Sequence, residues 1–236
     1  MRHFIDLNNF KVKELRKIIN FAKKIKKNKN TNKLILKNKC LGLIFEKQSI
    51  RTRLSFSIGI QKLGGHAKEL DIDQIGFGYR ETVHDILKTM SQYLDVLVIR
   101  NNNHKQLSEM ADLNILPIIN GLSDFSHPCQ VLSDVFTIEE NLGKIENKKI
   151  AWLGDFNNVL ISLIHAAEIF KFKLNIIIPK QLHTKSKKIL KKYSPRYCKL
   201  IDNFEVGLKN ADCIMTDVWT SMGEKKSKAK IEILKK

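Results

Sequence analysis

The stretch Leu41–Gly65, LGLIFEKQSIRTRLSFSIGIQKLGG, decides the fold. Its first five residues form an apolar run of the length expected for a buried strand. After a polar loop, apolar residues recur at helical spacing until Gly64 and Gly65, a pair typical of a helix end. The stretch therefore predicts a strand, a loop and a helix, the repeating unit of a parallel α/β sheet.

The same alternation extends along the chain in both directions. We expect an amphipathic helix over Val12–Ile25 and strands at Asp95–Arg100 and Ile115–Asn120. A long helix begins after Ser126, with Pro128 in its first turn, and stops at Gly143. Four further strands are predicted in the second half: Lys149–Asp155, Leu174–Pro179, Cys198–Asp202 and Asp212–Trp219.

These elements predict two α/β domains, each with a parallel sheet flanked by helices. We place the first domain at residues 1–142 and the second at 143–236. With 236 residues, 43% of them hydrophobic, the chain can bury one large or two modest cores. Its apolar runs are far shorter than the roughly 18 residues of a membrane span, and no secretory signal opens the sequence, so we expect a cytoplasmic protein without a membrane partner.

The cysteines and the net charge indicate whether a zinc site or a nucleic-acid surface is expected. The four cysteines form no CxxC pair, which argues against a disulfide framework and a zinc site. The net charge of +18 is concentrated in the runs 11–29, 185–199 and 225–236. The first run lies on an amphipathic helix, and aromatic residues do not interleave with the first and third runs in the manner of a base-stacking platform. We therefore favour solvated helix faces over a nucleic-acid surface. A steep salt dependence of DNA retention would support the alternative.

Two arginines and two hydroxyls occur where the first strand meets its helix, in Ser49–Arg53. Backbone N–H groups and the positive end of the helix dipole favour an anion there, and guanidinium groups add bidentate oxygen recognition. An ordinary capped helix with surface arginines is the competing interpretation. Arg100 directly follows another strand and His127 opens the long helix, so these side chains can converge with Ser49–Arg53 in one crevice. By itself, a histidine at a helix start is more often a cap or a packed side chain.

Polar residues also follow two strands of the second half. Asn158 follows the strand that ends near Asp155. Asp217 lies at the end of the last predicted strand, and Ser221 follows it. A carboxylate such as that of Asp217 suits an ammonium group, but these residue types also populate ordinary loops.

Four motifs in the same order resemble those of the carbamoyltransferase family. Phe45–Arg53, FEKQSIRTR, is similar to the phosphate motif FEKxSTRTR, and HPCQ at His127–Gln130 is similar to HPxQ. GDFNNV at Gly154–Val159 and DVWTSMG at Asp217–Gly223 resemble the two amino-acid motifs of the family members that act on ornithine. Together with the opening RHFIDLNNF, the resemblance extends over essentially the whole chain.

This resemblance implies transfer of the carbamoyl group of carbamoyl phosphate to the δ-amine of L-ornithine, giving citrulline and phosphate, without cofactor or metal. It implies that carbamoyl phosphate is bound by Ser49, the backbone N–H of Ile50, Arg51, Thr52, Gln74, Arg100, His127 and Gln130. Of these, Arg51, Arg100, His127 and Gln130 would be catalytic. The resemblance assigns ornithine to Asn158, Asp217, Ser221 and Met222. It also implies a homotrimer, with the loop at Gln74 reaching into a neighbouring subunit.

The chain departs from the family pattern at three places. The loop after Gln74 reads GFGYRETVHD, which differs from the tighter loop of the family at the position expected to reach a neighbouring subunit. Ile50 replaces a threonine of the phosphate motif, which removes a hydroxyl worth about 1.5–3 kcal/mol if it contacts a charged phosphate. The sequence ends thirteen residues after Gly223, with no His-Cys-Leu-Pro loop. We therefore expect a second domain without its final strand and closing helix, and impaired turnover. A non-catalytic remnant or binding subunit, and transfer to aspartate or putrescine, are the alternatives.

Overall fold

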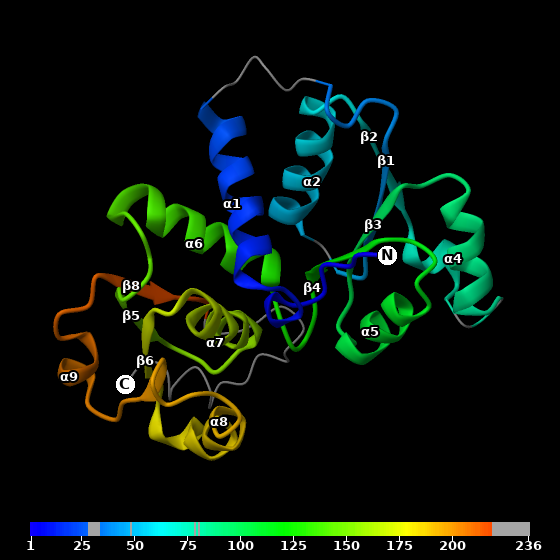
Figure 1. The fold of residues 1–236 in the computed structure, drawn as a ribbon. Coiled ribbons are helices and arrows are strands. Elements are labelled where there is room, and N and C mark those ends of the chain that lie inside the picture. The colour runs from blue at the N-terminus through cyan, green and yellow to red at the C-terminus, as the bar shows by residue number, and fades with distance from the viewer. Residues whose placement is uncertain (28–33, 48, 78, 80, 219–236) are drawn as a thin grey trace. The chain divides into compact units, whose positions relative to one another are not determined.

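The chain folds into two units in a computed structural model, which describes residues 1–27, 34–47, 49–77, 79 and 81–218 (Figure 1). The first unit comprises Met1–Asn9 and Lys13–Cys129, and the second comprises Phe10–Val12 and Gln130–Lys236. Each unit contains a four-stranded sheet in which every pair of neighbouring strands is parallel. The predicted α/β class with two parallel sheets flanked by helices is confirmed.

The first sheet has the order β2-β1-β3-β4. Strand β2 was not predicted, because its sequence HAKEL has no apolar alternation and the strand lies half-exposed at the sheet edge. Strand β4 begins three residues later than predicted, directly after Pro117, which has no N–H for a ladder. The elements up to this point are η1 (Leu7–Asn9), α1 (Val12–Lys27), β1 (Cys40–Phe45), α2 (Ile50–Lys62), β2 (His66–Leu70), α3 (Ile72–Ile75), α4 (Val83–Ser91), β3 (Val96–Arg100), α5 (His104–Asp112) and β4 (Ile118–Leu122).

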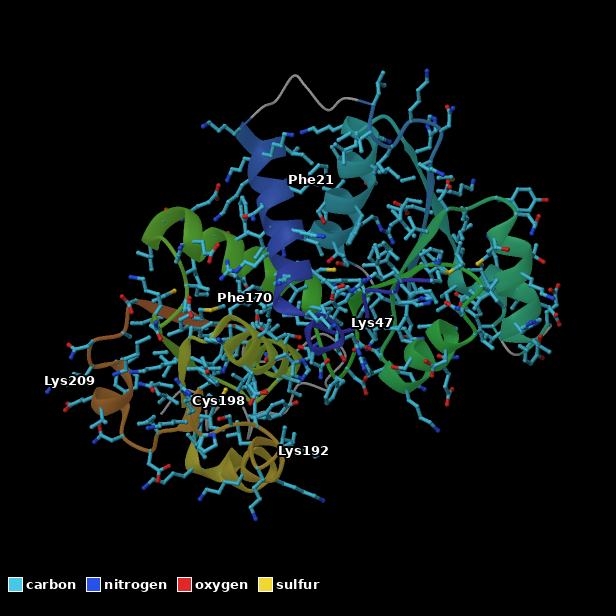
Figure 2. The ribbon with its side chains drawn as sticks, in the orientation of Figure 1. Phe21, Lys47, Phe170, Lys192, Cys198 and Lys209 are labelled. Atoms are coloured by element: carbon cyan, nitrogen blue, oxygen red, sulfur yellow. The ribbon has the colours of Figure 1, made fainter. Side chains whose placement is uncertain are left out.

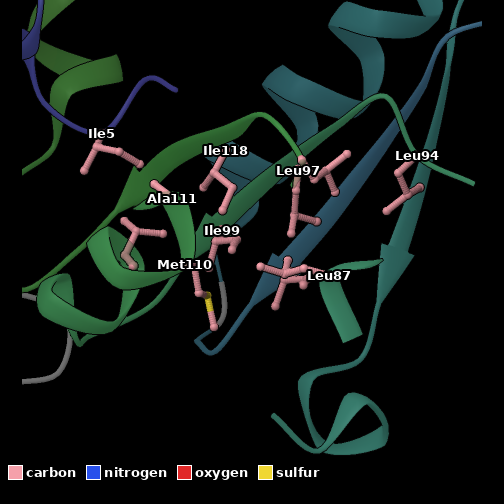
Figure 3. Packing of buried hydrophobic residues seen from close by; sticks show 11 residues of the cluster. Ile5, Leu87, Leu94, Leu97, Ile99, Met110, Ala111 and Ile118 are labelled. Atoms are coloured by element: carbon pink, nitrogen blue, oxygen red, sulfur yellow. The ribbon is translucent and has the colours of Figure 1, made fainter. Parts of the chain in front are cut away.

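Apolar side chains cover both faces of this sheet. On one face, Leu43 and Val98 pack in a cluster with Ile60 of α2. On the other, Leu97 and Ile99 pack with residues of α4 and α5, as Figure 3 shows for Leu87, Met110 and Ala111. Burial on both faces explains why β1 and β3 read as continuous apolar runs instead of alternating patterns.

The chain order reverses direction between β1 and β3. From β1 the chain moves to β2 on one side, then returns past β1 to β3 and β4 on the other. Helix α2, which follows β1, packs on one face, and α5, which follows β3, packs on the opposite face. A crevice at the carboxyl ends of two such strands is where open α/β sheets bind ligands.

Two predicted helices are confirmed close to their expected bounds. Helix α1 buries Leu15 and Ile19 and leaves its lysines at the surface, as an amphipathic pattern requires. Helix α6 (Pro128–Leu142) begins at the predicted proline, whose missing N–H is not needed in a first turn. Gly143 follows it with a φ of +76°, the left-handed conformation that glycine adopts at low cost.

The second sheet has the order β7-β6-β5-β8, so its chain direction reverses between β5 and β8. All four predicted strands are present, each shorter than its sequence pattern. The elements after α6 are β5 (Lys149–Leu153), α7 (Asn158–Phe170), β6 (Lys173–Ile177), η2 (Lys180–Leu182), α8 (His183–Leu190), β7 (Cys198–Leu200), α9 (Phe204–Leu208) and β8 (Cys213–Thr216).

The second unit has its own core around α7. This helix is apolar on nearly all sides and contacts β6 and β7. Figure 2 labels the buried Phe170 and Cys198 together with Lys192 and Lys209, whose side chains are exposed. Lysines at the surface and a separate buried core show that the second unit is a globular α/β body.

Candidate functional site

Three predicted residues of the first unit meet at the reversal between β1 and β3. Ser49 is the residue before α2, and Arg100 is the last residue of β3, paired in register with Phe45 of β1. Arg100 Nη1 donates a hydrogen bond to Ser49 Oγ at 2.7 Å and another to Thr52 Oγ1 at 3.4 Å. Arg100 and Ser49 are each only 6% exposed, so the guanidinium is held in a fixed place.

The Ser49 hydroxyl does not cap its own helix. Ser49 occupies the N-cap position of α2, yet its side chain makes no cap hydrogen bond within the described residues and instead accepts from Arg100. The N-terminus of α2, with its positive dipole end, thus lies next to a buried guanidinium. Backbone N–H groups and a cation together form a site for an oxyanion such as phosphate.

Arg51 contributes charge to this cluster although it is exposed. Its positive charge, after burial, is the second cause that lowers the pKa of Arg100. It also acts on His127, so the guanidinium is not remote from either residue. Two like charges near one another favour the binding of an anion that neutralises them.

His127 lies at the same place with a strongly altered pKa. The residue is 8% exposed and precedes α6. Burial lowers its pKa to about 4, with further contributions from Arg100 and then Arg51. At neutral pH the imidazole is therefore uncharged and can polarise a carbonyl oxygen through an N–H without adding to the positive charge.

Three other residues were predicted to bind carbamoyl phosphate: Ile50, Gln130 and Gln74. Ile50 is the first residue of α2, and its side chain is 74% exposed. Gln130 is half-buried in the first turn of α6, one helical turn after His127. Gln74 is exposed in α3, and its role stays a prediction.

A hollow of about 550 Å³ lies at the same end of the first sheet. Glu46 after β1 and Asn101 after β3 line it, together with Asp73 and Gly76 from the segment around α3. Glu46 accepts a hydrogen bond from the backbone N–H of Asn102 at 2.7 Å. The residues around α3 therefore lie beside the carboxyl ends of β1 and β3.

A second group forms within the second unit at the reversal between β5 and β8. Asn157 Nδ2 donates to Asp217 Oδ2 at 2.7 Å, while Asn157 Oδ1 accepts from the backbone N–H of Leu160 and caps α7. Asp217 directly follows β8, and its carboxylate is half-buried. Asn158, the predicted residue, is half-buried at the start of α7. The group offers a carboxylate and amides, which suit an amino acid.

Asp134 also faces Asp217 and was not predicted. Burial raises the pKa of Asp134 to about 6, and the negative charge of Asp217 raises it further. Asp134 lies in α6 one turn after Gln130, and this helical spacing is the signal for it in the sequence. Asn157 was missed because the resemblance pointed to its neighbour Asn158.

Ser221 and Met222 lie outside the described residues. Within the described ranges, no cluster of three or more His, Cys, Asp or Glu has the arrangement of a metal site. No helix in that part of the chain has both the length and the apolar character to span a membrane.

Both parts of the chain match models of known protein families. Residues 2–140 match the carbamoyl phosphate binding domain of the aspartate/ornithine carbamoyltransferases, and residues 146–236 match their aspartate/ornithine binding domain. The chain is thus a carbamoyltransferase of the kind that its motifs predicted.

Individual relatives and solved structures that resemble the chain are ornithine carbamoyltransferases. An ornithine carbamoyltransferase of Rhodopseudomonas palustris is 41% identical over 238 residues, which cover 99% of this chain and 77% of the relative. The ornithine carbamoyltransferase structure from Pyrococcus furiosus has a TM-score of 0.88 at 34% identity and is matched over 77% of its length. The anabolic enzyme from Campylobacter jejuni has a TM-score of 0.85 at 35% identity and is matched over 79%. The chain belongs to the ornithine carbamoyltransferase family.

Proposed function

We propose that the chain transfers the carbamoyl group of carbamoyl phosphate to the δ-amine of L-ornithine. The observation that carries the proposal is the buried Arg100 guanidinium, hydrogen-bonded to Ser49 beside the N-terminus of α2 and near Arg51 and His127. Family membership supports the reaction class, and the carboxylate of Asp217 supports a cationic amino-acid acceptor over an anionic one.

On the donor side, the proposed carbamoyl phosphate residues act electrostatically. Arg51, Arg100, Ser49, Thr52 and the first N–H groups of α2, including that of Ile50, hold the phosphate. The neutral His127, with Arg100 and Gln130, donates to the carbonyl oxygen, where negative charge develops as the tetrahedral intermediate forms. Gln74 completes this binding set in the proposal.

On the acceptor side, Asp217 holds an ammonium group of ornithine, with Asn158, Ser221 and Met222 as the other proposed contacts. The unprotonated δ-nitrogen attacks the carbamoyl carbon, forming a C–N bond. The bond from that carbon to the phosphate oxygen then breaks. The amine proton leaves with the phosphate as hydrogen phosphate, so atoms and charges balance. Catalysis in this scheme is positioning and charge stabilisation.

Purified protein assayed with carbamoyl phosphate and equal concentrations of ornithine, aspartate and putrescine tests the proposal. We expect citrulline from ornithine at a rate well above the products from the other two acceptors. A preference for aspartate or putrescine would overturn the acceptor assignment.

The domain roles and assembly form part of the same proposal. Residues 1–142 bind carbamoyl phosphate and residues 143–236 bind ornithine, within a homotrimer. The alternative of a binding subunit predicts calorimetric binding of carbamoyl phosphate without product from any acceptor. Sedimentation velocity with and without carbamoyl phosphate measures the oligomer directly.

A further inference from the structure

A series of hydrogen bonds crosses the interior of the first unit and ends beside His127. The Asp6 carboxylate lies 3.2 Å from His104 Nε2, and His104 Nδ1 lies 2.8 Å from Ser123 Oγ. Ser123 Oγ accepts from the backbone N–H of Ser126 at 3.1 Å. Ser126 directly precedes His127, so the series links the N-terminal segment to the loop that carries the proposed catalytic imidazole.

The order Asp6, His104, Ser123 is that of a catalytic triad, but the burial excludes that role. Ser123 and Ser126 are completely buried, and Asp6 is 6% exposed. A nucleophilic hydroxyl must reach its substrate, and the Ser123 hydroxyl is enclosed by protein. The arrangement is therefore suited to holding a loop and not to attacking a bond.

A second set of bonds fixes the same loop from β4. Asn120 Nδ2 donates to the carbonyl oxygen of Ile5 and to Ser126 Oγ, both at 3.0 Å. The His104 ring also packs on Phe125, with centroids 5.0 Å apart. The loop between β4 and α6 is thus fastened both to the N-terminal segment and to the start of α5.

We propose that Asp6, His104 and Ser123 are positioning residues that hold the His127 imidazole beside Arg100. This inference rests on the proposed function of His127 as the group that polarises the carbamoyl carbonyl. A displacement of about 1 Å at such a group can cost on the order of 100-fold in rate. The bonds reach His127 through the backbone of Ser126, so their loss should move the imidazole without removing it.

The direction of the bonds suggests which substitutions break the series. With a proton on His104 Nε2 facing Asp6, Nδ1 accepts from the Ser123 hydroxyl, which in turn accepts from the Ser126 N–H. Asp6 Oδ1 has no hydrogen-bond partner among the described residues, so His104 is the main compensation for this buried carboxylate. Asp6→Ala and Ser123→Ala remove the two ends. Asp6→Asn keeps an amide oxygen that accepts from Nε2, so it serves as the conservative variant.

The first test measures the pKa of His127, which depends on the surroundings of its ring. In nuclear magnetic resonance titrations of ring-labelled histidine, with His127→Gln to assign the signal, the wild-type midpoint should lie near 4. We expect Asp6→Ala and Ser123→Ala to raise it by one pH unit or more, because a displaced ring is less buried and lies farther from the charges of Arg100 and Arg51. Asp6→Asn and the control His84→Ala, an exposed histidine in α4, should leave it unchanged.

Citrulline assays of the same variants give the second readout. The two alanine variants should lose about tenfold or more in kcat with less than threefold change in KM for ornithine, and Asp6→Asn should restore it. If an alanine variant fails to fold, His104→Gln takes its place in both measurements. This variant keeps a donor toward Asp6 but has no group at the Nδ1 position to bond to Ser123, so the same changes in the His127 midpoint and in kcat are expected. A lowered melting temperature with an unchanged His127 midpoint would overturn the inference. Absence of citrulline from the wild type would refute the proposed function, while the titration would still decide the positioning role.

Discussion

Arg100 donates a hydrogen bond of 2.7 Å to Ser49 across the ends of two neighbouring strands. The two residues are 51 positions apart in the sequence, and the parallel pairing of β1 with β3 brings them together. Because the chain reverses direction between these strands, their following loops border one crevice. The fold itself therefore places a buried cation at the start of α2.

Ser49→Ala tests whether this hydroxyl serves binding more than folding. Since Ser49 makes no side-chain cap to α2, its loss should cost little helix stability. In the proposed function this hydroxyl also binds the phosphate. A hydrogen bond to a charged phosphate is worth about 1.5–3 kcal/mol, so we expect carbamoyl phosphate to bind roughly tenfold or more weakly by calorimetry. Ser55→Ala is the matched control on α2, because Ser55 is exposed and its hydroxyl donates a hydrogen bond to the carbonyl oxygen of Thr52. Equal losses in both variants would contradict the assignment.

His127 should remain neutral well below neutral pH. Its pKa in the folded chain is about 4, against an ordinary value of 6.5, so the unfolded chain binds the proton first as pH falls. Stability should therefore decrease as pH falls from 6.5 to 4, by up to about 3 kcal/mol from this group. His127→Gln should show a smaller decrease over the same range in urea unfolding followed by circular dichroism. A decrease as steep as that of the wild type would show that His127 is not the source.

Asp134 should produce the opposite dependence. Burial, and then Asp217, raise its pKa to about 6 from 3.8, so the folded chain retains the proton longer as pH rises. This group lowers stability progressively between pH 4 and 6, and the cost of up to about 3 kcal/mol persists at neutral pH. Asp134→Asn should be more stable relative to wild type at pH 7.5 than at pH 4. Tryptophan fluorescence in urea measures this, because Trp152 lies in β5. Asp217→Asn should remove only part of the effect, since burial is the larger cause.

Asn157 and Asn203 form a matched pair of helix caps in the second unit. Each accepts from a backbone N–H in the first turn of its helix, but only Asn157 also donates to Asp217. Asn157→Ala and Asn203→Ala should each lose about 1 kcal/mol of stability. Only Asn157→Ala should raise KM for ornithine, because Asp217 loses the bond that orients it. An equal rise in both variants would point to general destabilisation.

The sequence predicted helices α1, α2 and α6 and most strands because each carries a local signal. The proline and glycine that bound α6 and the apolar runs of β1 and β3 are examples. Strand β2 has no such signal, because its pairing with β1 at the sheet edge is a tertiary contact. Resemblance supplied the site residues, whereas their contacts depend on strand order.

The residues that were not predicted from the sequence act through partners that are far from them along the chain. Asn157 matters because β8 brings Asp217 next to the end of β5, and Asp134 matters because of the same carboxylate. Likewise, Asp6 contacts His104, and His104 contacts Ser123, where the N-terminal segment pairs with β4 at Phe4 and Ile119. Such contacts across long sequence separations leave no pattern in spacing or composition.

Calorimetric titration of carbamoyl phosphate into wild type and Arg100→Gln tests whether the buried Arg100 guanidinium binds the phosphate. Arg196→Gln is the control, because this arginine is exposed in the second unit. We predict saturable binding to the wild type and the control, and a loss of roughly 100-fold or more in Arg100→Gln, since a buried charge-assisted contact to phosphate disappears. Equal affinity in all three proteins, or no binding to the wild type, would contradict the account.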